Sequence, residues 1–126
     1  MKNASTWLIL GAAFALIGVL LGAFGAHALR NSLGPEMLAV WKTAVEYEFY
    51  HSFGLLAIGL LAMHRPPSRL LQAAGWSMAA GVLLFSGSLY ALALSAVPWL
   101  GMVTPFGGVA FIVAWGLLVA ALLRAD

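Results

Sequence analysis

The 126-residue chain contains no cysteine and very few charged residues. Without thiols it can form no disulfide, no thiolate metal site and no cysteine nucleophile. Only 8% of its residues are charged and 63% are hydrophobic, whereas a soluble domain has about 25% charged and about 45–50% apolar residues. A surface that faces water cannot be built from so few charges, and the composition therefore predicts a membrane protein.

The few charged residues leave three long charge-free intervals, at 3–29, 49–64 and 70–123. A helix that spans a bilayer needs roughly 20 mostly apolar residues. The first interval fits one helix, and the second fits one if that helix begins near Thr43. The third interval is long enough for two helices and is interrupted by the turn-forming segment 95–104. The spacing therefore predicts four transmembrane helices.

The predicted fold is an all-α integral membrane protein, with the four helices in an up-down bundle that forms one domain over residues 1–126. Gly34-Pro35 is typical of a helix start, and apolar residues at helical spacing after it predict a short amphipathic interfacial helix before the second transmembrane helix. Ser68 and Thr104 are placed to cap the third and fourth helices. The predicted bounds are about 6–29, 43–63, 70–94 and 104–123 for the transmembrane helices and about 35–43 for the interfacial helix.

The amino-terminal apolar run has a competing interpretation as a signal peptide, because it follows Lys2 and ends in the small-x-small pattern Ala26-His27-Ala28. The run is longer than the usual 7–15 residues of a signal-peptide core. We therefore predict a helix that is retained.

The basic residues are scattered singly at helix ends, which does not favour a nucleic-acid partner. Cytoplasmic connections of membrane proteins carry an excess of lysine and arginine. Both termini are therefore predicted to be cytoplasmic. One face would carry Lys2, Arg65, Arg69 and Arg124, and the other would carry Arg30 and Lys42.

With this topology, polar residues of the helices gather in the non-cytoplasmic half of the bilayer. Ionisable groups are costly inside a membrane and usually face the bundle interior or water. His51 has Tyr47 at i−4 and Glu48 at i−3, so these three share one helix face. The sequence predicts a polar pocket lined by His27, Tyr47, Glu48, His51, Ser86, Ser88, Tyr90 and Thr104.

This polar cluster has several interpretations. Its members can satisfy one another and clamp the helices together, or they can line a pocket for a lipid or small amphiphile, or form a proton path through His27 and His51. The spacing Glu48-x-x-His51 also occurs in di-iron bundles, but those need the motif on two helices and here it occurs once. A mononuclear metal site on His27, Glu48 and His51 is a further alternative. We predict no metal, no cofactor and no catalytic residue.

Small residues indicate where helices approach closely. Gly18, Gly22 and Ala26 recur every four residues, as in packing of the GxxxG type, and this stripe serves either packing within the bundle or self-association of chains. Gly87, Gly107 and Gly108 form similar small-residue spots on the third and fourth helices. Close packing or a flexible ligand gate would each explain them.

Four ordered motifs closely resemble a known family: GAFGAHAL at 22–29, the residues from Trp41 to His51, FSGSLY at 85–90, and WLG followed by TP and GG at 99–108. This is a family of small bacterial inner-membrane proteins catalogued as domain of unknown function four-two-three, with mitochondrial transmembrane relatives in animals. The resemblance implies a four-helix membrane protein and no known activity. The family often has glutamine at the position of Glu48, which shifts interest toward His27 and His51.

Three classes of function follow from these patterns. The first is a non-catalytic structural or accessory component of the bacterial inner membrane, which associates with itself, as a homo-oligomer, or with a larger membrane complex. The second is a binding module for a lipid or small amphiphile. The third is a minimal transporter or proton path centred on His27 and His51. Membrane lipids are the partners common to all three.

Overall fold

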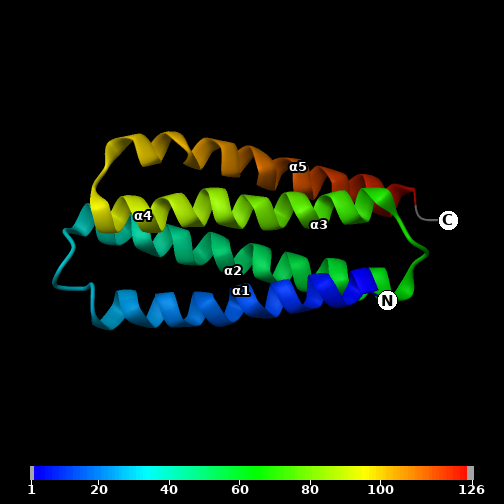
Figure 1. Cartoon of the computed structure of the whole chain (residues 1–126), viewed down its shortest axis with the longest axis horizontal. Helices are drawn as coiled ribbons and strands as arrows, with labels where there is room; N and C mark the ends of the chain where they lie inside the picture. The colour runs from blue at the N-terminus through cyan, green and yellow to red at the C-terminus, as the bar shows by residue number, and fades with distance from the viewer. Residues whose placement is uncertain (1, 125–126) are drawn as a thin grey trace.

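The computed structural model describes residues 2–124, with side chains from Ala4 onward. Four long helical segments lie side by side with alternating directions (Figure 1). Helix α1 packs most extensively against α2, α5 packs most extensively against α3, and α2 joins the two pairs through its contacts with α3, η1 and α4. In chain order the elements are α1 (Lys2–His27), α2 (Pro35–His64), α3 (Arg69–Gly81), the π-helical turn η1 (Val82–Ser86), α4 (Gly87–Ser95), the 3₁₀ turn η2 (Pro98–Met102) and α5 (Thr104–Leu123).

The helix ends follow from local sequence chemistry. Helix α2 begins at Pro35, whose fixed φ suits a first turn, and it ends where Pro66 and Pro67 cannot continue it. Ser68 caps α3, because its hydroxyl accepts a hydrogen bond from the amide of Leu71 at 3.2 Å. Ala96 ends α4 in the left-handed conformation, with φ of 57°.

Two features of the helices differ from the sequence prediction. Residues 35–43 form no separate interfacial helix, because α2 runs without a break from Pro35 to His64. Trp41, Ala44 and Glu48 are all buried on this helix, so one buried face continues through the predicted boundary and keeps the helix in a single piece. The third helical segment contains the π-helical turn η1, for which the sequence offers no signal.

Three segments are long and apolar enough to cross a membrane: Ala4–His27, Arg69–Ser95 and Pro98–Leu123. Helix α2 has 30 residues but carries three glutamates and a lysine in its first half, and a histidine, His51, near its middle. Large hydrophobic side chains are exposed on the outer surfaces, including Ile9 at 66%, Leu83 at 65% and Ile112 at 74%. Such extensive apolar exposure is typical of a surface that contacts lipid rather than water.

Glycines bring α1 close to α2. A Cβ on Gly18 would lie 3.1 Å from the ring of Phe49, and one on Gly22 would lie 3.4 Å from Val45. The structure thus uses these two members of the predicted stripe for packing within the chain, whereas the third, Ala26, is exposed. On α5, Gly107 packs directly against the backbone of Phe85.

The two other predicted small-residue positions, Gly108 and Gly87, are less closely packed than Gly107. A Cβ on Gly108 would touch only the ring of Phe85, at 3.9 Å. Gly87 is exposed, and a Cβ added to it would have no atom within 4 Å, because this position points away from both neighbouring helices. Gly87 therefore makes no helix contact, contrary to the prediction that it packs between the third and fourth helices.

Most of the buried apolar residues form two clusters at different heights along the helices. On α2, Trp41 belongs to one cluster with Leu29 and Ala93. Leu55 and Ile58 belong to the other, whose remaining members are Trp7, Leu71, Ala74, Met78, Ala114 and Leu118. The buried polar residues of α2 lie between these two clusters, and this layer is the candidate functional site.

Candidate functional site: a buried polar layer between the helices

Glu48 lies inside the polar layer, with only 2% of its surface exposed. Its Oε1 accepts a hydrogen bond of 2.7 Å from the hydroxyl of Tyr90 on α4. Its Oε2 has no hydrogen-bond partner among the described residues. The ring of Tyr90 packs at 4.7 Å from that of Trp41, which encloses the pair on one side. The contact joins α2 to α4 through a single polar bond in apolar surroundings.

His51 is 4% exposed and has a partner on each ring nitrogen. Nδ1 lies 2.6 Å from the backbone carbonyl of Tyr47, and Nε2 accepts a hydrogen bond of 3.0 Å from the indole N–H of Trp115 on α5. Since a carbonyl only accepts and an indole N–H only donates, the proton of the imidazole is on Nδ1. The imidazole also stacks on Phe111, with 3.4 Å between ring centroids and 6° between planes.

Serine and threonine hydroxyls connect further pairs of helices. Ser86, in η1, donates to the carbonyl of Ala44 on α2 at 2.7 Å and is fully buried. Ser88, on α4, pairs with Thr104 at the start of α5 at 2.6 Å. Ser77 donates to the carbonyl of Ala110 on α5 at 2.7 Å. These bonds link every helix of the second half of the chain to a neighbour.

The structure does not bring together all of the predicted pocket residues. His27 is exposed at the end of α1, because α1 ends there and the chain turns toward α2. Thr104 uses its hydroxyl on Ser88, and no side chain caps α5. Tyr47 is 38% exposed and contributes its backbone carbonyl and its ring, which lies 4.7 Å from Phe85. The remaining five residues lie within the buried layer.

Three members of the layer were not predicted. Trp115 and Phe111 complete the surroundings of His51, and Ser52 donates to the carbonyl of Glu48 at 2.7 Å. The spacing of Phe111 and Trp115 at i and i+4 places them on one face of α5. Aromatic residues are common in any membrane helix, however, so this spacing gives no sign of which face meets His51.

The layer resembles a set of bonds between helices more than a binding cavity. Within residues 2–124 there is no group of three histidine or carboxylate side chains that could hold a metal ion. A cavity of about 300 Å³ opens between α1 and α2 near Trp41, lined also by Lys42 and Glu46. Of the eight predicted pocket residues, none lines this cavity.

Long apolar helices, a hydrocarbon-like exterior and an internally hydrogen-bonded polar layer define a helical membrane protein. The chain belongs to the DUF423 family, whose model, described as "protein of unknown function", matches residues 21–108. This finding confirms the family resemblance of the sequence motifs.

Relatives in several bacteria carry names that agree with this class. The UPF0382 membrane protein YwdK of Bacillus subtilis is 46% identical over 118 residues, which cover 94% of this chain and 96% of that protein. A UPF0382 membrane protein of Staphylococcus epidermidis is also 46% identical, over 94% and 95% of the two chains. One of Staphylococcus saprophyticus is 47% identical over 113 residues, or 90% and 92%. No solved structure matches the chain.

Proposed function

We propose that this protein is a non-catalytic structural or accessory component of the bacterial inner membrane, built as a bundle of four transmembrane helices. The observation that carries the proposal is the polar layer, whose side chains bond to one another across helix boundaries. Tyr90 binds Glu48 and Trp115 binds His51. Polar side chains that hydrogen-bond to one another between helices stabilise a bundle, and each pair contributes about 0.6–2 kcal/mol.

Helix α2 is the fourth crossing in this proposal. It lies antiparallel to α1 and in contact with α1, α3 and α4, and its buried polar residues face other helices. A helix so enclosed can cross the bilayer with polar residues, because the hydrocarbon does not meet them. With four crossings, α1 begins and α5 ends on the same side, and the basic residues favour the cytoplasm for that side.

The topology can be tested with single-cysteine variants, because the chain has no cysteine of its own. Ser32→Cys and Ser95→Cys are at exposed positions at one end of the molecule, and Pro67→Cys is at an exposed position at the other. We expect a membrane-impermeant maleimide to label the first two in intact spheroplasts and Pro67→Cys only after the membrane is opened. Labelling of Ser32→Cys and Pro67→Cys from one side would show that α2 does not cross.

The stabilising role of the polar layer can be tested with a double-mutant cycle on Tyr90 and Glu48. Tyr90→Phe should destabilise the protein in detergent, and this loss should shrink when Glu48→Leu has already removed the acceptor, with a coupling of about 0.6–2 kcal/mol. The chain offers a matched control in Tyr50, whose hydroxyl bonds to Glu46 at 3.3 Å on the exposed face of α2. We expect Tyr50→Phe to show coupling near zero with Glu46→Leu.

Two outcomes would contradict the proposal that the polar layer holds the helices together. One is equal coupling in the buried and exposed pairs, because the buried bond would then add nothing. The other is proton flux through the purified protein in liposomes that His51→Ala abolishes, since this would favour the proton path. His27 lies outside the buried layer, so any such path would have to reach His51 by another route.

The lipid-binding alternative draws support from the cavity of about 300 Å³ between α1 and α2, which combines the apolar Trp41 and Val45 with the charged Lys42 and Glu46. This mixture suits an amphiphile, and membrane lipids are the partners proposed for it. Self-association has less support from the glycine stripe, since Gly18 and Gly22 already pack against α2.

A further inference from the structure

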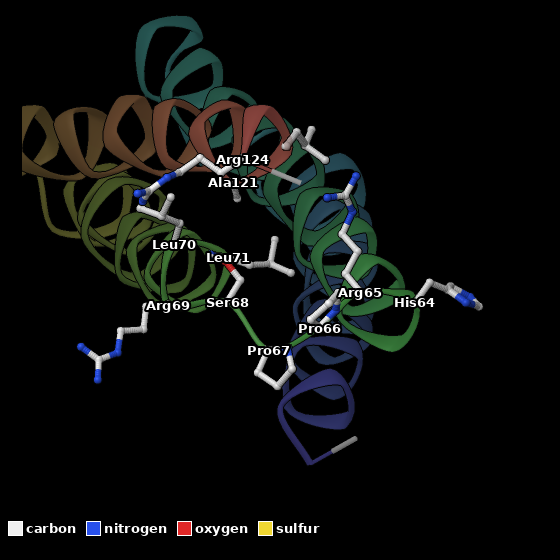
Figure 2. Close-up of a pocket in the computed structure, with 11 residues that line it drawn as sticks. His64, Arg65, Pro66, Pro67, Ser68, Arg69, Leu70, Leu71, Ala121 and Arg124 are labelled. Carbon is white, nitrogen blue, oxygen red and sulfur yellow. Dashed lines mark hydrogen bonds between the residues drawn. The ribbon is translucent and has the colours of Figure 1, made fainter. Parts of the chain in front are cut away.

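A second polar region lies at the end of the molecule where α1 begins, α2 ends, α3 begins and α5 ends, which we call the terminal end. It contains a cavity of about 590 Å³ bounded by the end of α2, the connection 65–68, the start of α3 and the end of α5. Figure 2 shows this space with the side chains around it. It is separate from the buried polar layer and shares no residue with it.

The cavity is rich in positive charge. Arg65, Arg69 and Arg124 line it. In Figure 2 Arg65, directly after α2, and Arg124, directly after α5, lie on two sides of the space, whereas Arg69 extends away from it. The carboxylates within residues 2–124 are those of Glu36, Glu46 and Glu48, all in the first half of α2 and thus toward the opposite end. The guanidinium group of an arginine that faces such a cavity can bind a phosphate group through two parallel hydrogen bonds.

The start of α3 adds backbone donors at the same place. The hydroxyl of Ser68 accepts a hydrogen bond from the amide of Leu71, and its backbone carbonyl accepts one from the amide of Gln72. The amides of Arg69 and Leu70 are the first two of the helix. They have no acceptor within it, because no helical carbonyl lies four residues before them. The first turn of a 13-residue helix therefore presents N–H groups and the positive end of its dipole to the cavity, which favours an anion.

An unpartnered donor lies beside these groups. A smaller cavity of about 220 Å³ shares Arg65, Ser68 and Leu71 with the first and is lined in addition by Trp7 and Gln72. Trp7 is 1% exposed, and its indole N–H has no hydrogen-bond partner among the described residues. The indole belongs to the smaller cavity and not to the larger one. A buried donor without an acceptor costs free energy, and an oxygen acceptor that reached this N–H from the neighbouring space would remove that cost.

The floor of the larger cavity is apolar, formed by Leu70, Leu71, Ala121 and Leu122. We infer that the cavity binds a phosphate group attached to an apolar body, with Arg65 and Arg124 as its main donors and the first turn of α3 as its backbone support. The phosphate belongs to a phospholipid headgroup or to a soluble phosphate ester. A basic connection that served only as a topology signal would need neither the cavity nor the unpaired indole.

The test uses the whole chain purified in mild detergent, where its orientation in a membrane plays no part. Native mass spectrometry measures retention of phosphatidylglycerol and of diacylglycerol, which has the same tails but no phosphate. Arg65→Gln combined with Arg124→Gln is compared with Arg30→Glu, which changes the net charge by the same amount at the opposite end, at an exposed residue that lines none of the cavities described above. Because Arg30 and Arg124 are exposed and Arg65 is half-buried, both variants should keep the melting temperature of the wild type.

We expect the wild type to retain phosphatidylglycerol and not diacylglycerol. The Arg65/Arg124 variant should retain at least about tenfold less phosphatidylglycerol, and the Arg30→Glu variant should retain as much as the wild type. A parallel experiment measures the melting temperature of the wild type and of the Arg65/Arg124 variant with and without inorganic phosphate. If phosphate raises it in the wild type and not in the Arg65/Arg124 variant, the ligand is a soluble phosphate; if only the lipid is retained, it is a headgroup. Equal retention of diacylglycerol, or equal losses of phosphatidylglycerol in the Arg65/Arg124 and Arg30→Glu variants, would overturn the inference.

Discussion

Replacing His51 with alanine is expected to cause a large loss of thermal stability in detergent, about 3 kcal/mol or more. The imidazole fills a site against Phe111 and accepts the indole proton of Trp115. Its removal leaves a cavity next to Phe111 and an indole N–H without its acceptor. Since Trp115 is 40% exposed on an apolar helix, hydrocarbon rather than water would surround that donor, and nothing there would replace the lost bond.

His27→Ala is the matched control for this prediction. His27 is exposed at the end of α1, so its loss should change the free energy of unfolding by no more than about 0.5 kcal/mol. Trp115→Phe removes the donor to His51 and part of the ring but leaves the imidazole in place, and should cost less than His51→Ala, about 1–2 kcal/mol. Equal losses for the two histidine variants would show that His51 does not have the special role in packing assigned to it.

Replacing Gly107 with alanine is expected to be the most damaging change of a small residue. The added Cβ would overlap the backbone nitrogen of Phe85 and lie 2.7 Å from its Cα. Backbone atoms of the π-helical turn cannot move aside as a flexible side chain can, so α5 would be pushed away from η1. Overpacking of this kind costs about 1–3 kcal/mol, and displacement of α5 would also weaken the bond between Ser88 and Thr104.

Gly116→Ala, on the same helix, provides the control. A Cβ on Gly116 would have no atom within 4 Å, and alanine forms helices better than glycine by about 1 kcal/mol. We therefore expect Gly116→Ala to keep or raise the melting temperature while Gly107→Ala lowers it. A Gly107→Ala protein as stable as the wild type would mean that η1 and α5 are not packed as closely as described.

The buried polar layer explains how a chain with few charges can place a glutamate and a histidine inside an apolar fold. Neither side chain contacts an ion of opposite charge in the layer. One carboxylate oxygen of Glu48 accepts from Tyr90, and the imidazole of His51 has a partner on α5 and another on its own helix. Such bonds are directional, so they specify the rotation of each helix as well as its contact with the next. Lipid-facing surfaces made of leucine, isoleucine and valine cannot provide that specificity.

Much of the architecture was predictable because it depends on residues close together in the chain. Membrane character follows from composition, and the helix ends at Pro35, Ser68 and Thr104 lie within one turn of their predicted places. The face shared by Glu48 and His51 follows from the period of a helix. Motifs that run through most of the chain were sufficient to identify its family.

Other features depend on how the helices are rotated and how far they slide past one another, which local spacing does not specify. Glycine contacts such as Gly107 on Phe85 set these positions. They bring Trp115 to His51 across 64 residues of sequence and Tyr90 to Glu48 across 42, while they leave His27 outside. In the same way, only the packed structure places Arg65 and Arg124 around one cavity. The sequence by itself determined that this chain is an apolar helical membrane protein; the tertiary structure decided which of its few polar groups meet, because side-chain packing, not periodicity, aligns one helix with another.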